Sequence, residues 1–488
     1  MKKLVSVIAA AALMCGALCF VACEPAPEEE NITSYVIDAT LDTSAMTVAA
    51  TEKVTYVNSG EAELDGVYFH LYPAAFRQDA RYASVSDTSV SDAYPGGVDY
   101  GGITIESVTV GGENAEWSIG GEDEDILIVS GLTLLPGDAA EIDIAFSLDI
   151  PQTRHRFGFY NGIVNLGNWY PVACVYENGG WRTDPYYSNG DPFYSDVADY
   201  TVTLTAPTGW NAAGTGSVSA EVNGDTTVTT FTAECVRDFA LTVSDKYTSV
   251  ETAVEGGPTV RYYYAADSDA ERHLQVCADA VTTFSSLFGD YAYDTLTVAL
   301  TPFLYGGMEY PQLAFVSDSL QGDLLDEAII HEIAHQWWYA AVGNDQINQA
   351  WMDEGLAEYS VTLFYENNPD YGVSAEDRIA DAMQSYVLFT EMYDELIGGD
   401  TSMNRGLGDY FSQTDYSFHT YVKGELLFDS LRHSVGDDKF FDSLKNYYTQ
   451  YTGLIASPDD LVACFENTSG FDLKGFFDSW VNGTVGLY

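Results

Sequence analysis

The chain has 488 residues, with 74 acidic and 19 basic side chains and a formal net charge of −55 at pH 7. Such a charge repels phosphate backbones and anionic membrane surfaces, which excludes nucleic acid as a binding partner. Beyond residue 23 the cysteines include no C-x-x-C pair, which excludes a thiolate metal site and leaves either disulfides or buried thiols for Cys174, Cys235, Cys277 and Cys464.

The first 23 residues are predicted to be an export signal. Lys2 and Lys3 precede an uncharged apolar run over 4–22, which is typical of signal peptides and also nearly long enough for a transmembrane anchor. Small residues before Cys23 resemble a bacterial lipoprotein processing site, and the acidic segment 24–30 is predicted to be a solvated tether. The sequence therefore favours a cell-surface protein, lipid-anchored to the cytoplasmic membrane through Cys23, with simple secretion as the alternative.

Residues 31–247 are predicted to form an N-terminal antiparallel β domain, either a sandwich or a saddle-shaped sheet. Short runs of alternating polar and apolar residues are separated by turns rich in Gly, Asn and Asp. The clearest of these runs cover residues 33–43, 52–58, 199–205 and 226–233. The histidines in and just after this region are interpreted as structural residues; these are His70, His155 and His273.

A second domain is predicted over residues 248–488. Near its start a Gly-Gly-Pro segment at 256–258 interrupts the β pattern, and a helix over 267–287 and a strand over 295–300 follow. The strand leads into a Gly-Gly-Met-Glu segment at 306–309. Its glycines allow close approach of a peptide, and an edge strand there could pair with substrate main chain.

The central motif of this domain is His331-Glu332-x-x-His335. Two histidines four residues apart on a helix lie on one face, so both imidazoles reach the same metal ion. Glu332 lies about 100° round the helix and is predicted to act on a metal-bound water as general base. Glu354 is the predicted third ligand, since two histidines and one glutamate form a catalytic zinc set. The alternative is a chance match, with two core histidines satisfied by carbonyl groups.

Capping signals predict the surrounding helices. Asp323 and Asp326 mark the start of the histidine helix and Gly343 its end, while Ser457 and Gly470 bound a later helix. Residues 398–417 are expected to form a loop beside the active site. The other expected helices cover residues 350–365, 375–396, 421–433 and 437–448.

His-Glu-x-x-His followed after eighteen residues by Glu resembles the gluzincin zinc metallopeptidases of the aminopeptidase N family. Two further segments agree with that family in order and spacing. The first resembles its exopeptidase motif and consists of Gly306, Gly307, Met308 and Glu309. The second resembles its catalytic-tyrosine segment and consists of Tyr421, Val422, Lys423 and Gly424. The family's usual Asn after the glutamate is replaced by Tyr310, which bears on local hydrogen bonding and side-chain preference.

The resemblance covers the chain from about residue 31 onward and implies an α+β multidomain fold. In such a fold the β domain closes one end of a cleft over a thermolysin-like, mainly helical domain. The aromatic segment 167–171 is expected either to form part of that wall or to be ordinary core. The chain ends 67 residues after Tyr421, so the large C-terminal helical domain of many family members is expected to be absent.

These features together predict an aminopeptidase that acts on peptides with a free N-terminus. His331, His335 and Glu354 are expected to hold one Zn²⁺ per chain. Glu332 is the expected base, Tyr421 the oxyanion donor and Glu309 the partner of the substrate ammonium group. Asp353 and Glu358 are candidates for orienting the imidazoles, and Tyr416 and His419 are weaker candidates for the donor. The alternatives are an endopeptidase or other gluzincin hydrolase, and a catalytically silent surface-binding protein.

Overall fold

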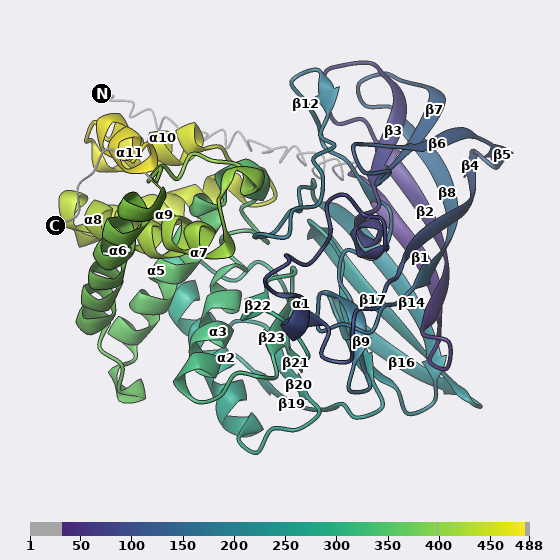
Figure 1. Ribbon diagram of the computed structural model, residues 1–488, viewed down its shortest axis with the longest axis horizontal. Helices are drawn as coiled ribbons and strands as arrows, with labels where there is room; N and C mark the ends of the chain where they lie inside the picture. Colours follow the sequence, from purple (N-terminus) through teal and green to yellow (C-terminus); the bar gives the residue numbers. More distant parts are fainter. Residues whose placement is uncertain (1–31, 398, 484–488) are drawn as a thin grey trace, which may run out of the picture. The chain divides into compact units, whose positions relative to one another are not determined.

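The computed structural model describes residues 32–397 and 399–483 (Figure 1). These residues belong to one compact unit, and the predicted signal, Cys23 and the tether lie outside them. Figure 1 shows strands through the first half of this unit and helices through the second, which confirms the predicted α+β fold. No helix in the described part of the chain is both long and apolar enough to span a bilayer.

The first half contains one large sheet, two four-stranded sheets and a short hairpin of β12 (Tyr176–Glu177) and β13 (Gly180–Trp181). The large sheet has eight strands in the order β16 (Ser217–Asn223), β17 (Thr226–Val236), β14 (Ala198–Pro207), β1 (Ser34–Asp42), β2 (Thr47–Val57), β8 (Ala139–Asp149), β4 (Gly102–Val110) and β5 (Glu113–Asn114). One smaller sheet runs β15 (Asn211–Gly214), β18 (Leu241–Ser244), β10 (Ile163–Leu166) and β9 (Phe157–Tyr160). The other runs β11 (Val172–Ala173), β3 (Leu64–His70), β7 (Ile126–Leu134) and β6 (Glu116–Gly120).

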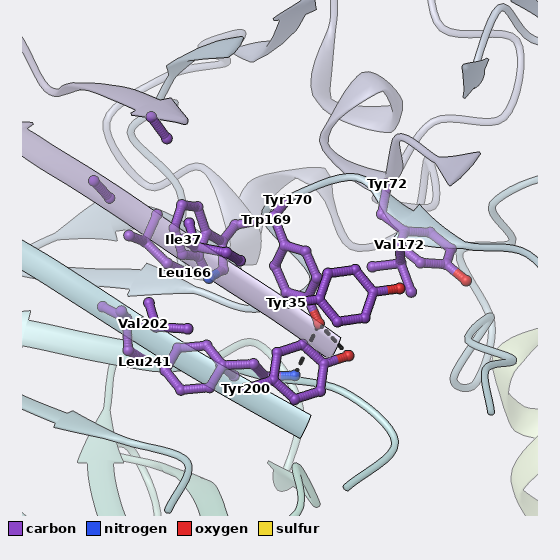
Figure 2. Packing of buried hydrophobic residues seen from close by; sticks show 14 of the residues in the cluster. Tyr35, Ile37, Tyr72, Leu166, Trp169, Tyr170, Val172, Tyr200, Val202 and Leu241 are labelled. Carbon is purple, nitrogen blue, oxygen red and sulfur yellow. Dashed lines mark hydrogen bonds between the residues drawn. The ribbon is translucent and has the colours of Figure 1, made fainter. Parts of the chain in front are cut away.

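Alternate side chains of the central strands form the core of this half, as the period of a strand requires. Figure 2 shows Tyr35 of β1 stacked on Tyr200 of β14, with ring centroids 4.7 Å apart, and the Tyr170 hydroxyl donating to that of Tyr200 over 3.0 Å. Trp169 and Tyr170 are completely buried in this cluster. Segment 167–171 is therefore core, not cleft wall.

The second half begins with a five-stranded sheet. Its order is β19 (Thr248–Ala253), β20 (Thr259–Tyr264), β21 (Thr295–Thr301), β23 (Leu313–Ser317) and β22 (Gly307–Met308). The chain passes from β18 to this sheet between Ser244 and Thr248. Strand β22 is an edge strand, antiparallel to β23, so the expected edge strand at the Gly-Gly-Met-Glu segment is present.

Helices make up most of the remainder: α2 (Ala270–Phe288), α3 (Asp323–Ala334), α4 (Gln346–Gln349), α5 (Trp351–Asn367), α6 (Ala375–Ile397), α7 (Gln413–Ser417), α8 (Lys423–Val435), α9 (Asp437–Tyr451), α10 (Pro458–Ser469) and α11 (Lys474–Val481). Ser457 and Gly470 cap α10 as predicted, through a capping box and a left-handed residue respectively. Within the described part, Cys174, Cys277 and Cys464 are buried thiols, while Cys235 is exposed.

The predicted ends of the histidine helix are wrong. Gly322, with a φ of 59°, is the N-cap in place of Asp323, and α3 stops at Ala334, well before Gly343. Gly343 is needed for a different reason, because a Cβ there would overlap the buried Arg237 guanidinium. That guanidinium donates to the carbonyl groups of Tyr339, Ala341 and Leu454 and so holds the turns that follow α3.

Tyr421 also lies in a different setting from the one expected. It belongs to a π-helical turn, η4 (Phe418–Val422), that joins α7 to α8, so it lies inside a continuous helical run and does not open a helix. The predicted loop over 398–417 is correspondingly wrong at its end, where α7 begins with Ser412 as its cap. π-Helical turns inside α-helices are frequent at functional sites.

Tyr310 joins the two halves of the unit. Its ring is completely buried, packs edge-on against Phe315 and belongs to the core of the first half. A Cβ at Gly167 would overlap the Tyr310 hydroxyl and lie 2.7 Å from its Cζ. The Tyr310 ring therefore points into the core and anchors the segment that carries Glu309.

Gly167→Ala is expected to lower the free energy of unfolding by about 1–3 kcal/mol, because the added methyl group overpacks the Tyr310 pocket. Urea denaturation measures the change. Tyr310→Phe in the same background should recover part of it, since the hydroxyl is the nearest atom. Gly180→Ala is the control, because a Cβ at that glycine has no neighbour within 4 Å. Equal losses for both glycines would contradict the tight contact.

Candidate active site

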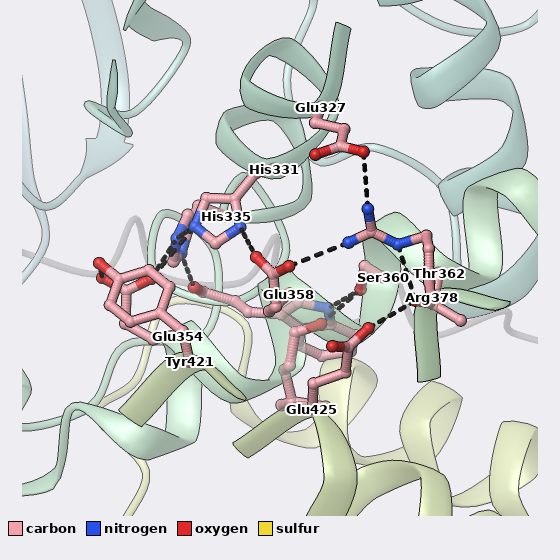
Figure 3. Close-up of polar contacts among 12 residues, drawn as sticks. Glu327, His331, His335, Glu354, Glu358, Ser360, Thr362, Arg378, Tyr421 and Glu425 are labelled. Atoms are coloured by element: carbon pink, nitrogen blue, oxygen red, sulfur yellow. Dashed lines mark hydrogen bonds and ion pairs between the residues drawn. The ribbon is translucent and has the colours of Figure 1, made fainter. Parts of the chain in front are cut away.

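Three predicted ligand atoms converge between α3 and α5. His331 and His335 come from the last turn of α3 and its C-cap, and Glu354 comes from the first turn of α5. The two Nε2 atoms are 3.1 Å apart, and each lies 3.2 Å from Oε2 of Glu354 (Figure 3). Two ligands about 2 Å from a tetrahedral zinc ion stand about 3.3 Å apart, so this spacing fits one ion.

The other imidazole nitrogens both lie close to an oxygen atom. His335 Nδ1 lies 3.0 Å from the Trp338 carbonyl oxygen, and His331 Nδ1 lies 3.1 Å from Oε2 of Glu358, an ion-pair contact without hydrogen-bond alignment. With protons on Nδ1, both Nε2 atoms present lone pairs towards each other and towards Glu354. Lone pairs and a carboxylate that face one another in a buried place repel unless a cation lies among them. The residues present therefore fit a metal ion better than a pair of core histidines.

Glu332 lies beside the ligand set without joining it. Its Oε2 is buried and has no hydrogen-bond partner among the described residues. Burial raises the pKa of its carboxyl group well above the ordinary value, although the His331 imidazole opposes this. A Cβ at Gly307 would overlap the Glu332 carboxylate, so this glycine lets edge strand β22 pass directly over the side chain. Glu332 is thus confined next to the ligands and can exchange a proton.

Tyr421 is the tyrosine that reaches the ligand set. Its hydroxyl donates to Oε1 of Glu354 over 2.5 Å, and its ring stacks on His331 with centroids 5.7 Å apart (Figure 3). Tyr416 packs edge-on behind it in the core, and His419 is completely buried, with Nδ1 at Asp415. The geometry therefore favours Tyr421 over both weaker candidates.

Glu309 lies on another side of His335. Ligand-type atoms of Glu309, His335 and Asp353 all lie within 4.8 Å of one another, but the group shares His335 with the first set and is no second site. The Gln346 amide donates to Glu309 over 2.9 Å and to Asp353 over 2.7 Å. Burial raises the pKa of Glu309, His335 opposes the rise, and Glu354 adds to it. A cationic group bound there would reduce the electrostatic repulsion between these carboxylates.

The two predicted imidazole-orienting residues differ in what they contact. Glu358 faces His331 directly, as expected. Asp353 accepts from Asn344 and Gln346, and the carbonyl oxygen of Trp338 takes its place at His335. Asp353 therefore orients the amide that contacts Glu309.

Sequence reasoning missed two cleft residues from the first half. The cleft has a volume of about 290 Å³, and its lining includes Arg156, Asp191, Gly307, His331, Glu332 and Tyr421. Arg156 Nη1 lies 2.9 Å from Oδ1 of Asp191. Burial and nearby Glu309 raise the pKa of Asp191 to about 7. Both residues lie outside regular strands and motifs, so no local pattern could have revealed them.

Comparison with known sequences finds a similarity to peptidases over the second half of the chain. Residues 273–480 match the sequence model of the peptidase family M1 domain. Aminopeptidase B from Homo sapiens is 28% identical over 255 residues, which cover 47% of this chain and 38% of that protein. Aminopeptidase N from Streptomyces lividans is 26% identical over 236 residues, which cover 45% of this chain and 26% of that protein. The match thus spans well under two thirds of these relatives.

Solved structures share the whole fold. An M1 zinc metallopeptidase from Deinococcus radiodurans superposes with a TM-score of 0.66 at 17% identity, covering 93% of this chain and 94% of that one. A mutant of that protein bound to a Tyr-Ser-Ala substrate gives a TM-score of 0.67 at 18% identity, with the same coverage of each chain. The comparison shows that these proteins share the fold in which β-rich sheets precede a mainly helical part.

Glu332→Gln is expected to retain the metal content of the wild-type protein, because Glu332 is not among the converging ligand atoms. His335→Ala should lose the metal, since it removes one of three ligands. Elemental analysis after dialysis against dilute zinc measures both. Loss of metal from the Glu332→Gln protein would assign that carboxylate to the ligand set.

Proposed function

We propose that the chain, whose residues 273–480 match the model of the peptidase family M1 domain, is a zinc-dependent aminopeptidase that removes N-terminal residues from peptides. The observation that carries the proposal is Glu309, a buried carboxylate held beside a three-ligand metal set in a cleft. A metal set alone would suit many hydrolases. A fixed carboxylate next to it suits a substrate that begins with an ammonium group.

His331, His335 and Glu354 would hold one zinc ion per chain, in keeping with the zinc named for the structurally similar proteins. When bound, zinc lowers the pKa of a water molecule at its open position and polarises the substrate carbonyl group. The remaining chemistry belongs to the side chains around it.

Glu332 accepts a proton from the attacking water and passes it to the leaving nitrogen. Its unpartnered oxygen and its position beside His331 support this role. Tyr421 donates its hydroxyl proton in a hydrogen bond to the scissile carbonyl oxygen as that atom gains negative charge. To do so the hydroxyl turns from Glu354, its partner in this structure. The Glu332→Gln variant that keeps its metal should accordingly lose nearly all hydrolysis.

Glu309 sets which bond is cut. A substrate ammonium group that enters the cleft loses water and needs a charged partner, or its desolvation is uncompensated. A carboxylate fixed beside the ligands supplies that partner and places the first peptide bond at the reacting position. Asp191 is one further carboxyl group in the cleft wall and is already paired with Arg156.

Glu309→Ala is expected to lower kcat/KM for substrates with a free N-terminus. The loss should correspond to about 2–5 kcal/mol of transition-state stabilisation, the usual effect of removing one side of a buried ion pair. Fluorogenic aminoacyl substrates measure this. N-acetylated versions are the matched control, because they never use the contact and should be poor substrates for both proteins. Internal cleavage of blocked peptides as fast as of free ones would instead make the protein an endopeptidase.

We also propose that the protein is exported and held at the cell surface by a lipid on Cys23. The support is the apolar run before Cys23, the small residues beside it and the acidic segment that follows.

Cys23→Ser should release the protein from the membrane fraction or block its processing, because the serine cannot carry a thioether-linked lipid. Fractionation of cells followed by immunoblotting measures the distribution. Wild-type protein found soluble in the medium would replace lipid anchoring with simple secretion.

A further inference from the structure

A chain of polar contacts leads from His331 through Glu358 in the cleft wall to Arg378 in the helical half (Figure 3). Nδ1 of His331 lies 3.1 Å from Oε2 of Glu358. The other oxygen of Glu358 accepts from Nη2 of Arg378 over 3.0 Å. The ligating imidazole is thus two contacts away from a guanidinium group on α6.

Arg378 binds three groups at once. Besides Glu358 it donates from Nη1 to Glu327 over 2.8 Å and from Nε to the Thr362 hydroxyl over 3.2 Å. Glu327 lies on α3, one turn before His331, whereas Glu358 and Thr362 lie on α5, one and two turns after Glu354. One planar group therefore connects the helix that carries the histidines to the helix that carries the third ligand.

The same network reaches the helical run that contains Tyr421. The Thr362 hydroxyl accepts from Arg378 and donates to Oε1 of Glu425 over 2.5 Å. Glu425 is buried on α8, which continues directly from the π-helical turn of Tyr421. All three helices that supply the site are thus joined through the Arg378 guanidinium.

The position of Glu358 is expected to depend on the positive charge of Arg378. Three carboxylates surround the network, and the Arg378 side chain between them is 15% exposed, whereas Glu358 and Glu327 are 25% and 32% exposed. Without the guanidinium, Glu358 would lose the contact that fixes its second oxygen and would be free to leave His331 for solvent. An imidazole whose Nδ1 partner is fixed binds a metal more tightly, because its ring orientation and tautomer are already set.

We propose that Arg378 is a positioning residue that acts through Glu358 on His331 and so sets the affinity of the site for its metal. The inference rests on the proposed metal site and identifies a determinant of it outside the sequence motifs. Within the described part of the chain, Arg378 contacts none of the predicted ligands and does not itself line the cleft, but two of its partners, Glu327 and Glu358, are cleft-lining residues.

Arg378→Met is expected to weaken zinc binding about 10–100-fold, the usual effect of losing a partner that orients a ligand. Competition with a chromophoric chelator measures the dissociation constant of the protein directly, without any peptide substrate. Arg432→Met is the matched control, since Arg432 also pairs with two carboxylates, Glu366 and Asp437, and packs over an aromatic ring, but lies elsewhere. Its zinc affinity should equal that of the wild type.

Arg378→Lys keeps the charge but cannot hold all three partners, so it tests the inference if the Met variant does not fold. It should leave the thermal unfolding of the metal-free protein close to wild type while zinc binding weakens. In a Glu358→Gln background the same change should have little further effect on zinc affinity, because the route through Glu358 is already broken.

Wild-type zinc affinity in folded Arg378→Lys protein, or full additivity with Glu358→Gln, would overturn the inference. Either outcome would leave the proposal of peptidase activity unaffected. Conversely, a wild-type protein that binds zinc but cleaves no peptide would refute the proposed function, while the chelator competition would still decide the role of Arg378.

Discussion

Two imidazole nitrogens and one carboxylate oxygen held within 3.2 Å of one another are the constraint on which the helical half depends. Each atom is directed by a contact on its far side, and those contacts dictate the local fold. Helix α3 ends where it does because the Trp338 carbonyl must turn back to His335. The turns that follow are in turn fixed by Arg237, which comes from the end of β17. The β-rich half thus contributes to the site without supplying a ligand.

The same site concentrates negative charge where water is scarce. Glu309, Glu332, Asp353 and Glu354 are all buried, and burial raises the pKa of the first three. The two imidazoles reverse the effect at Glu354 and hold its pKa at about 2. In the proposed function, a metal ion and a substrate ammonium group would be the two cations that relieve the repulsion between these carboxylates.

Features with a local cause were predictable from the sequence, and features with a distant cause were not. The histidine pair, Glu354 and the caps of α10 follow from helix spacing and capping, which depend on neighbouring residues alone. Gly343 was misread as a helix stop because its real requirement, room for Arg237, comes from another part of the chain. Arg156 and Asp191 left no pattern for the same reason. The orientation of Tyr310 was not predictable either, since only the fold reveals that its ring points into the core.

Two glycines of the motifs are also required by a contact between segments far apart in the sequence. Gly355 follows the ligand Glu354, and Gly424 lies three residues after Tyr421. A Cβ at Gly355 would lie 2.9 Å from the Cα of Gly424, and a Cβ at Gly424 would lie 2.6 Å from the Cα of Gly355. Helices α5 and α8 therefore cross at a contact that only two glycines allow. Because Tyr421 and Glu354 flank this crossing, its closeness permits their 2.5 Å hydrogen bond. Gly424 is thus required for close packing of the two helices, and this packing sets the distance between the Tyr421 hydroxyl group and the predicted metal ligands.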